Sequence, residues 1–304
     1  MNKIRYSIIA MVFSLFFAGC TSVKPEMGQV VFNSPDEAVA SLKDAVKNND
    51  TKRLMEILGP QGKDIVFSGD DKYDAEARAW FTRKAEEKTG IVKIEEASFI
   101  ELGNDKWPFP VPIAKYDGKL FFYTAAGVDE MLNRRIGKNE LNAIMVCRAL
   151  VNAQEDYAKI KLLGGAVKEY ASKLFSEKGR KDGLYWDDEG SKEKSPIGAL
   201  IVLASQESPE SARKPYHGYF YKILTAQGEA APGGEKSYMS ADGKMTGGFA
   251  IAAYPASYGV SGIKTFIVSK NGIIFEKDLG KDTLKSAREM TLFNPDDSWA
   301  PVRD

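Results

Sequence analysis

Few residues in this chain can carry out acid, base or nucleophilic chemistry. It has a single histidine, His217, and two cysteines, Cys20 and Cys147. Any Ser/His/Asp or Cys/His catalytic arrangement would therefore have to use His217 as its base. His217 lies between Tyr216 and Gly218 at the start of a predicted strand. We interpret it as a histidine hydrogen-bonded to backbone at a strand end.

Two adjacent carboxylates, Asp187 and Asp188, follow the aromatic pair Tyr185 and Trp186. Glycosidases need two carboxyl groups and sugars stack on aromatic faces, so this segment is a candidate acid/base pair or sugar platform. Adjacent side chains of an extended segment point apart, however, and a solvated turn is the favoured interpretation. The residues that we regard as candidates for ligand binding are Tyr185, Trp186, Tyr216, His217 and Tyr219.

Cysteine and metal chemistry are restricted by the same counts. Cys147 falls in the apolar stripe of a predicted helix, which predicts a buried and inert thiol. One histidine and one available cysteine are too few for a zinc site, and we expect no cofactor. The acidic stretch from Asp70 to Asp74 lacks the order of a calcium loop and carries a lysine, so we predict a turn and a helix cap there.

Charge and composition exclude several classes of function. The 304 residues include 42 basic and 42 acidic ones, interspersed along the chain. A chain without excess positive charge has no electrostatic footprint for nucleic acid. The hydrophobic content of 43% is an ordinary globular value, so we expect a folded protein with a real core.

The N-terminus has the pattern of an export signal. Lys3 and Arg5 precede an apolar run, residues 8–17, that is too short to span a bilayer permanently. The residues that follow, Phe17-Ala18-Gly19-Cys20, resemble the bacterial lipoprotein box. This resemblance implies removal of residues 1–19 and diacylation of Cys20, which would anchor the protein to a membrane. With threonine and serine next in the chain, it also implies the outer membrane of a Gram-negative envelope, facing the periplasm or the surface.

The remaining chain is expected to form an α+β fold with two modules. After the signal peptide (1–19) and a tether (20–32), we predict an N-terminal module of helices and a small antiparallel sheet over residues 33–127. Residues 128–290 are expected to form a second module, in which a long helix packs on an antiparallel meander. Residues 291–304 form a C-terminal tail that Trp299 is expected to dock onto the body.

Individual elements follow from local patterns. Ser34-Pro35 followed by Glu37 predicts a helix start. The dipeptides Asp117-Gly118 and Asn271-Gly272 predict hairpin turns. Helices are predicted over residues 74–88, 129–160, where Gly137 could interrupt, 167–175 and 283–290. Strands are predicted over residues 219–224, 249–254, 264–269 and 273–277. The prolines beside Trp107 predict an edge segment whose aromatic rings close the first core.

The sequence resembles a bacterial exported family known as domain of unknown function 2950. The resemblance rests on residues 107–110, 134–141, 182–186, 215–219 and 231–234, and it covers nearly the whole mature chain. It implies no activity. Residues 139–158 and the strands after residue 218 are also similar to the spine helix and meander of type IV pilin and pseudopilin heads. No continuous apolar spine precedes Asp129, so the resemblance implies a pilin-like head without the usual pilus-forming helix.

Two hypotheses of function follow. In the first, the chain is a lipid-anchored, non-enzymatic binding or scaffolding module whose partner is an envelope protein or glycan. In the second, it is a cell-wall-directed hydrolase that uses His217 with a carboxylate near Tyr185 and Trp186. The second hypothesis requires these side chains to converge in one cleft.

Overall fold

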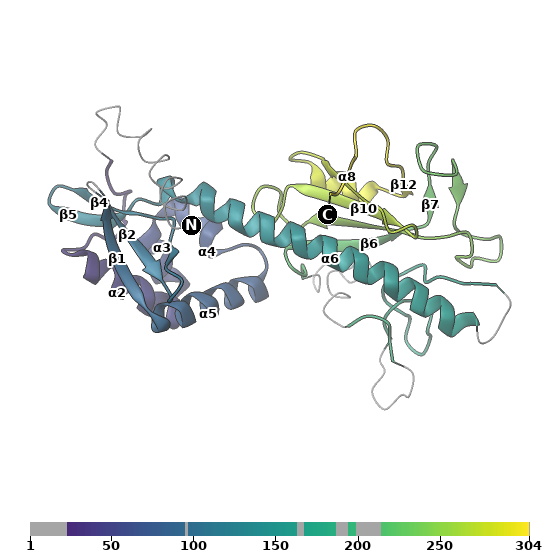
Figure 1. Cartoon of the computed structure of the whole chain (residues 1–304), viewed down its shortest axis with the longest axis horizontal. Coiled ribbons are helices and arrows are strands. Elements are labelled where there is room, and N and C mark those ends of the chain that lie inside the picture. Colours follow the sequence, from purple (N-terminus) through teal and green to yellow (C-terminus); the bar gives the residue numbers. More distant parts are fainter. Residues whose placement is uncertain (1–22, 95–96, 163–166, 187–193, 199–213, 304) are drawn as a thin grey trace. The chain divides into compact units, whose positions relative to one another are not determined.

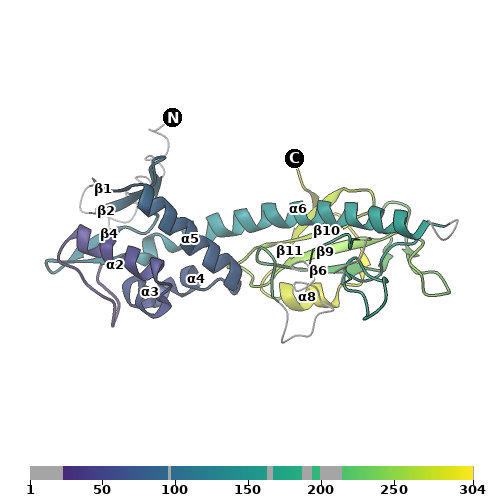
Figure 2. The ribbon, with the colours of Figure 1, turned by 90° about the horizontal axis from the view of Figure 1, so that it is seen from below.

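The structure is a computed structural model, and it describes residues 23–94, 97–162, 167–186, 194–198 and 214–303. It divides into two compact units, one ending at Arg134 and the other beginning at Arg135. Each unit combines helices with mainly antiparallel strands, so the α+β class is confirmed. Figures 1 and 2 show the elements of each unit from two directions.

The helices of the first unit begin where the sequence places capping residues. Ser34 precedes α2 (Pro35–Lys47), and its Oγ accepts a 3.1 Å hydrogen bond from the N–H of Glu37, as predicted. Asp50 caps α3 (Thr51–Leu58) in the same way. The further helices of this unit are η1 (Pro60–Gly62), α4 (Lys63–Val66), α5 (Asp71–Glu87) and η2 (Thr124–Ala126).

The acidic stretch before α5 has the structural role predicted for it. The carboxylate of Asp70 accepts a 3.0 Å hydrogen bond from the N–H of Tyr73 and so caps the helix. Asp74 accepts hydrogen bonds from the N–H of Ser68 at 3.1 and 3.2 Å. Because Asp70 is the cap, α5 begins three residues before the predicted start.

The sheet of the first unit has the order β1-β2-β4-β5, and the short strand β3 pairs with β2. Its neighbours along this order are antiparallel. The turn at Asp117-Gly118 joins β4 and β5 as predicted, with positive φ angles at both residues. The strands are β1 (Thr89–Ile94), β2 (Ala97–Leu102), β3 (Trp107–Pro108), β4 (Ile113–Tyr116) and β5 (Lys119–Phe122).

The core of the first unit lies between these helices and one face of the sheet. Apolar residues of α2, α3 and α5 pack against Ile100, Ile113 and Phe122 of the strands. Phe109 is buried in this cluster, and Trp107 packs against it from the short strand β3. The aromatic segment therefore closes the core, as the sequence predicts.

Helix α6 (Val128–Leu162) is continuous through Gly137, where the sequence allowed an interruption. Its residues up to Arg134 belong to the first unit and the rest to the second. In the second unit Ala143, Cys147 and Leu150 share a core cluster with residues of β6, β9 and β10. The helix is thus packed on the sheet by a stripe at helical spacing.

The sheet of the second unit has the order β13-β11-β10-β9-β6, with antiparallel neighbours throughout. A second, three-stranded sheet contains β12, β7 and β8, in which β12 and β7 run parallel. The main strands are β6 (Tyr219–Leu224), β9 (Ala250–Pro255), β10 (Lys264–Ser269), β11 (Ile274–Asp278) and β13 (Ala300–Pro301). The short ones are β7 (Ala226–Gln227), β8 (Lys236–Ser237) and β12 (Leu292–Phe293).

The two faces of this sheet carry different helices, α6 on one side and α8 (Thr283–Glu289) on the other (Figures 1 and 2). Lys222 of β6 joins the sheet to the end of α8. Its ammonium donates hydrogen bonds to the carbonyl oxygens of Arg288 and Met290 at 2.9 and 2.7 Å. A cation at this position complements the negative end of the helix. Trp299 packs against the core, as expected of the tail.

The prediction of a helix over residues 167–175 is wrong. Tyr170 instead forms an isolated bridge with Met245, and Phe175 forms one with Tyr185. The apolar residues of this segment reach the core from a chain of bends and isolated bridges, and Tyr170, Ala171 and Leu174 are all buried there. These apolar residues are spaced as on one face of a helix, and in a short apolar run such spacing does not distinguish a helix from other structures.

Candidate functional site

His217 lies in a two-residue turn that leads into β6. The φ angles of His217 and Gly218 are 53° and 75°, and the backbones of Tyr216 and Tyr219 donate to each other at 2.9 and 3.2 Å. Positive φ at both central residues defines a type I′ turn. The imidazole of His217 packs on the ring of Tyr216, with centroids 4.2 Å apart. The histidine thus occupies a left-handed position in a turn beside a strand.

A polar cluster of the buried Asn139 and the half-buried Glu140 lies next to this turn. Asn139 of α6 donates from Nδ2 to the carbonyl oxygen of Ser261 at 2.9 Å, and the same Nδ2 packs against Gly218. Glu140 accepts two hydrogen bonds of 3.0 Å, from the N–H groups of Ile263 and Lys264. Three stretches that are distant in sequence therefore meet around one amide and one carboxylate. These contacts fix α6 to the sheet of its own unit.

Tyr219, the first residue of β6, belongs to the same cluster. Its side chain is fully buried, and its hydroxyl donates to the carbonyl oxygen of Lys264 at 2.9 Å. Burial is the main cause that raises the pKa of this phenol, and the charge of Glu140 acts in the same direction. A side chain held in this way stabilises the fold and does not present itself to a ligand.

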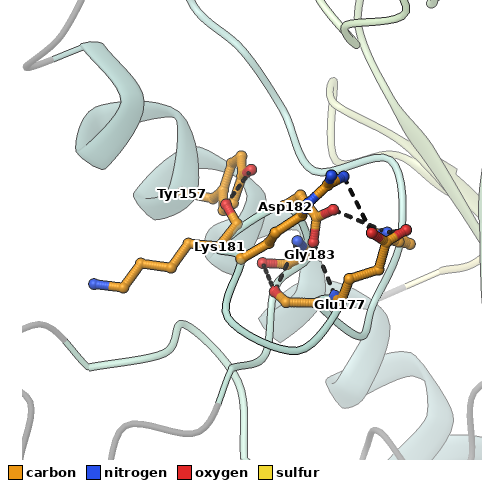
Figure 3. A network of polar contacts seen from close by, with 8 residues as sticks. Tyr157, Glu177, Lys181, Asp182 and Gly183 are labelled. Carbon is orange, nitrogen blue, oxygen red and sulfur yellow. Dashed lines mark hydrogen bonds and ion pairs between the residues drawn. The ribbon is translucent and has the colours of Figure 1, made fainter.

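Tyr185 and Trp186 end a hydrogen-bonded loop, part of which is shown in Figure 3. Tyr185 exchanges backbone hydrogen bonds with the segment around Leu174 and stacks on Phe175 with centroids 6.0 Å apart. Trp186 is 4% exposed and lies in the core of the second unit. Its indole therefore offers no open face for a sugar. Asp187 and Asp188, the proposed carboxylate pair, lie outside the described residues.

The loop itself is held by a network of charged and polar groups (Figure 3). The hydroxyl of Tyr157 donates to the carbonyl oxygen of Lys181 at 2.9 Å. Asp182 forms an ion pair of 3.0 Å with Lys173 and accepts a hydrogen bond from the N–H of Glu177. Burial acts to raise the pKa of Asp182, but these two partners outweigh it and lower the pKa. The carboxylate therefore stays ionised as part of the loop.

Cys147 is completely buried in the stripe of α6 that packs on the sheet. Desolvation raises the pKa of its thiol to about 12. A thiol of this kind stays protonated at neutral pH and is a poor nucleophile. Cys20 lies outside the described residues.

A groove in the first unit, which we call the α2–α5 groove, lies between α2, α5 and β1. Its volume is about 630 Å³, within the range of ligand sites. Val39, Phe81 and Ile91 contribute apolar surface to it, while exposed charged residues of both helices form its margins. Lys47 and Glu86 form an ion pair of 3.1 Å between the two helices. The full lining is Asp36, Val39, Ala40, Lys43, Asp44, Lys47, Phe81, Thr82, Ala85, Glu86, Thr89 and Ile91.

The site residues chosen from the sequence do not include any residue of this groove. Helical spacing in α2 and α5 and the alternation in β1 were visible in the sequence. Those patterns tell which residues face inward, but not that the two helices leave a hollow between them. The signal that could have drawn attention to it is the alternation of charged and apolar residues along one face of α2, from Asp36 to Lys47.

Comparison with known proteins places this α+β chain in a family. The model of the family described as "Protein of unknown function (DUF2950)" matches residues 29–302, and the chain belongs to that family. No curated protein and no solved structure matches the chain. Within the described ranges, no helix has both the length and the apolar character needed to cross a membrane.

The contact between Gly218 and Asn139 gives a first prediction. Alanine at Gly218 or at Gly259 must adopt a left-handed φ, which costs each variant roughly 1–2 kcal/mol. A Cβ on Gly218 would also lie 2.5 Å from Nδ2 of Asn139, whereas Gly259 has open space around it. Gly218→Ala is therefore expected to lower the free energy of unfolding by about 1–3 kcal/mol more than Gly259→Ala. Urea unfolding measures both, and equal losses would contradict the described packing.

The buried thiol gives a second prediction, on alkaline stability. The pKa of Cys147 rises from an ordinary value of 9.0 to about 12 on folding, so its contribution is complete below pH 9.0 and is lost as pH rises toward 12. In the Cys20→Ser protein the free energy of unfolding should decrease as pH rises above 9.0. Adding Cys147→Ala should make this decrease less steep, by up to about 1.4 kcal/mol per pH unit. Urea unfolding from pH 8 to pH 11 would show this, and identical slopes would refute it.

Proposed function

We propose that this chain is a lipid-anchored, non-enzymatic binding module of the bacterial envelope. Its anchor would be the acylated Cys20, which the basic residues Lys3 and Arg5 and the apolar run of residues 8–17 support. After removal of the signal, acidic residues outnumber basic ones by two. The body would thus be tethered by its lipid rather than by electrostatic attraction to an anionic membrane.

The observation that carries the binding role is the α2–α5 groove. An open hollow of about 630 Å³ with an apolar floor and a charged margin suits recognition of another molecule. Its charged margin residues Lys47 and Glu86 are paired with each other on the surface. In the second unit, by contrast, the histidine lies in a turn and the thiol lies in the core. These positions support recognition over catalysis.

The second unit would serve as a pilin-like scaffold. Helix α6 crosses the antiparallel strands β6, β9 and β10, and the resemblance of residues 139–158 to a pilin spine helix supports this comparison. Leu141 and Met145 are about 65% exposed and lie one turn apart on the helix, away from the sheet. In this proposal the second unit contributes structure, and the first unit contributes the binding groove.

Photo-crosslinking in living bacteria tests this function. A photo-reactive amino acid at Ala40, an exposed residue of the groove, should capture a defined envelope component, whereas one at the exposed Lys52 of α3 should not. Cys20→Ser should abolish incorporation of radiolabelled palmitate and strongly reduce the Ala40 adduct, because the head would no longer be held at the membrane. Equal adducts at both positions, or an Ala40 adduct unaffected by Cys20→Ser, would contradict the proposal.

A further inference from the structure

Strand β1 forms an open edge of the sheet in the first unit. In the order β1-β2-β4-β5 it is the terminal strand, and among the residues that the structure describes it pairs with β2 alone. An edge strand presents a row of backbone N–H and C=O groups that lack partners in the sheet. The α2–α5 groove includes Thr89 and Ile91 of this same strand.

The backbone groups that face the open edge can be identified from the register. Ile100 of β2 pairs with Ile91, and its carbonyl oxygen accepts a 2.8 Å hydrogen bond from Phe109, which lies beyond the other side of β2. Ile100 therefore directs its hydrogen-bonding groups away from β1, and the pair is a non-hydrogen-bonded one. It follows that the N–H and C=O of Ile91 point away from β2, toward the open edge.

A second contact confirms this assignment. The N–H of Gly103 donates to the carbonyl oxygen of Lys88 at 2.8 Å, so hydrogen-bonded positions of this strand have even numbers. Lys93, like Ile91, has an odd number, so its backbone N–H and C=O also face the open edge. Across the described ranges, neither residue has a hydrogen-bond partner on that side.

Side chains alternate along a strand with the same period, so Thr89, Ile91 and Lys93 share one face. Ile91 is half-buried beside the groove, and Lys93 is exposed further along the strand. The apolar floor and the unpaired backbone groups therefore coincide at Ile91. Lys93 makes no ion pair within the part of the chain that the structure describes.

We propose that the α2–α5 groove binds an extended polypeptide segment of a partner, which adds as a strand to the open edge of β1. The segment places an apolar side chain beside Ile91 and an acidic side chain opposite Lys93, where opposite charges stabilise a cross-strand pair. This proposal rests on the proposed binding function and names the class of its partner. A lipid tail or a glycan would fill the groove without matching the alternate N–H and C=O groups of the edge.

The test uses random seven-residue peptides displayed on phage and selected against the purified mature chain carrying Cys20→Ser. We expect recovered peptides in which apolar residues alternate with polar or acidic ones. Lys93→Pro removes an edge N–H while leaving the β1–β2 hydrogen bonds intact, because that N–H points outward. It should weaken peptide binding about tenfold or more, through the lost hydrogen bond and the clash of the proline ring.

The matched control is Lys93→Gln, which keeps the N–H and removes the charge. It should weaken binding by acidic peptides by no more than about fivefold, the size of one cross-strand charge pair. Lys93→Glu should shift the selection toward peptides with a basic residue at that position. Circular dichroism and urea unfolding of each variant establish that the fold is retained.

A second measurement uses the parent protein and modified peptides, and so does not depend on the proline variant folding. N-methylation of successive peptide residues should abolish binding at every second position only. Uniform tolerance of N-methylation, equal binding to Lys93→Pro and Lys93→Gln, or recovery of no peptide would each overturn the proposal. If the Ala40 crosslink forms while the peptide pattern is absent, the groove binds by another mode and the proposed function stands. Loss of the Ala40 crosslink removes the function itself.

Discussion

Both sheets depend on one constraint: an antiparallel ladder makes side chains and backbone groups alternate together along each strand. In β1 it makes Ile91 both a wall of the α2–α5 groove and a residue whose N–H and C=O face the open edge. In β6 it directs Tyr219 and Tyr221 toward α6 and Lys222 toward the end of α8. A slip of one residue in either strand would exchange these roles completely.

The same alternation of side chains has different consequences in the two units. In the second unit both faces of the sheet are covered, and every residue of β9 is buried. Two residues with reactive side chains are buried by this packing: Cys147 lies in the interface of α6 with the sheet, and the hydroxyl of Tyr219 donates to the carbonyl oxygen of Lys264. In the first unit the sheet ends at β1, and among the described residues no strand pairs with its outer edge. The proposed binding segment therefore adds at the edge where the described sheet ends.

Much of the fold could be predicted from local signals. The cap at Ser34 and the hairpin across Asn271-Gly272 are decided by residues adjacent in sequence, and both are confirmed. The hairpin turn is not of the primed type, because Gly272 has a positive φ and Asn271 does not. The prediction of a helix over residues 167–175 is wrong, because Tyr170 and Leu174 satisfy a helical spacing although they enter the core from a segment of bends and isolated bridges. The groove could not be predicted, since a hollow depends on the distance between α2 and α5, and single-sequence patterns carry no such distance. The polar cluster of Asn139 and Gly218 depends likewise on contacts between distant segments.

The most direct test of the central claim is amide hydrogen exchange of β1, resolved residue by residue by NMR in the free protein. If the alternate groups of this strand face an open edge, the amides of Ile91 and Lys93 will exchange quickly, while those of Gly90 and Val92 will be protected by pairing with β2. Uniform protection along the strand would mean that the edge is already covered. Fast exchange at Gly90 and Val92 instead would mean that the register is shifted, and the site proposed at Ile91 would then have no basis.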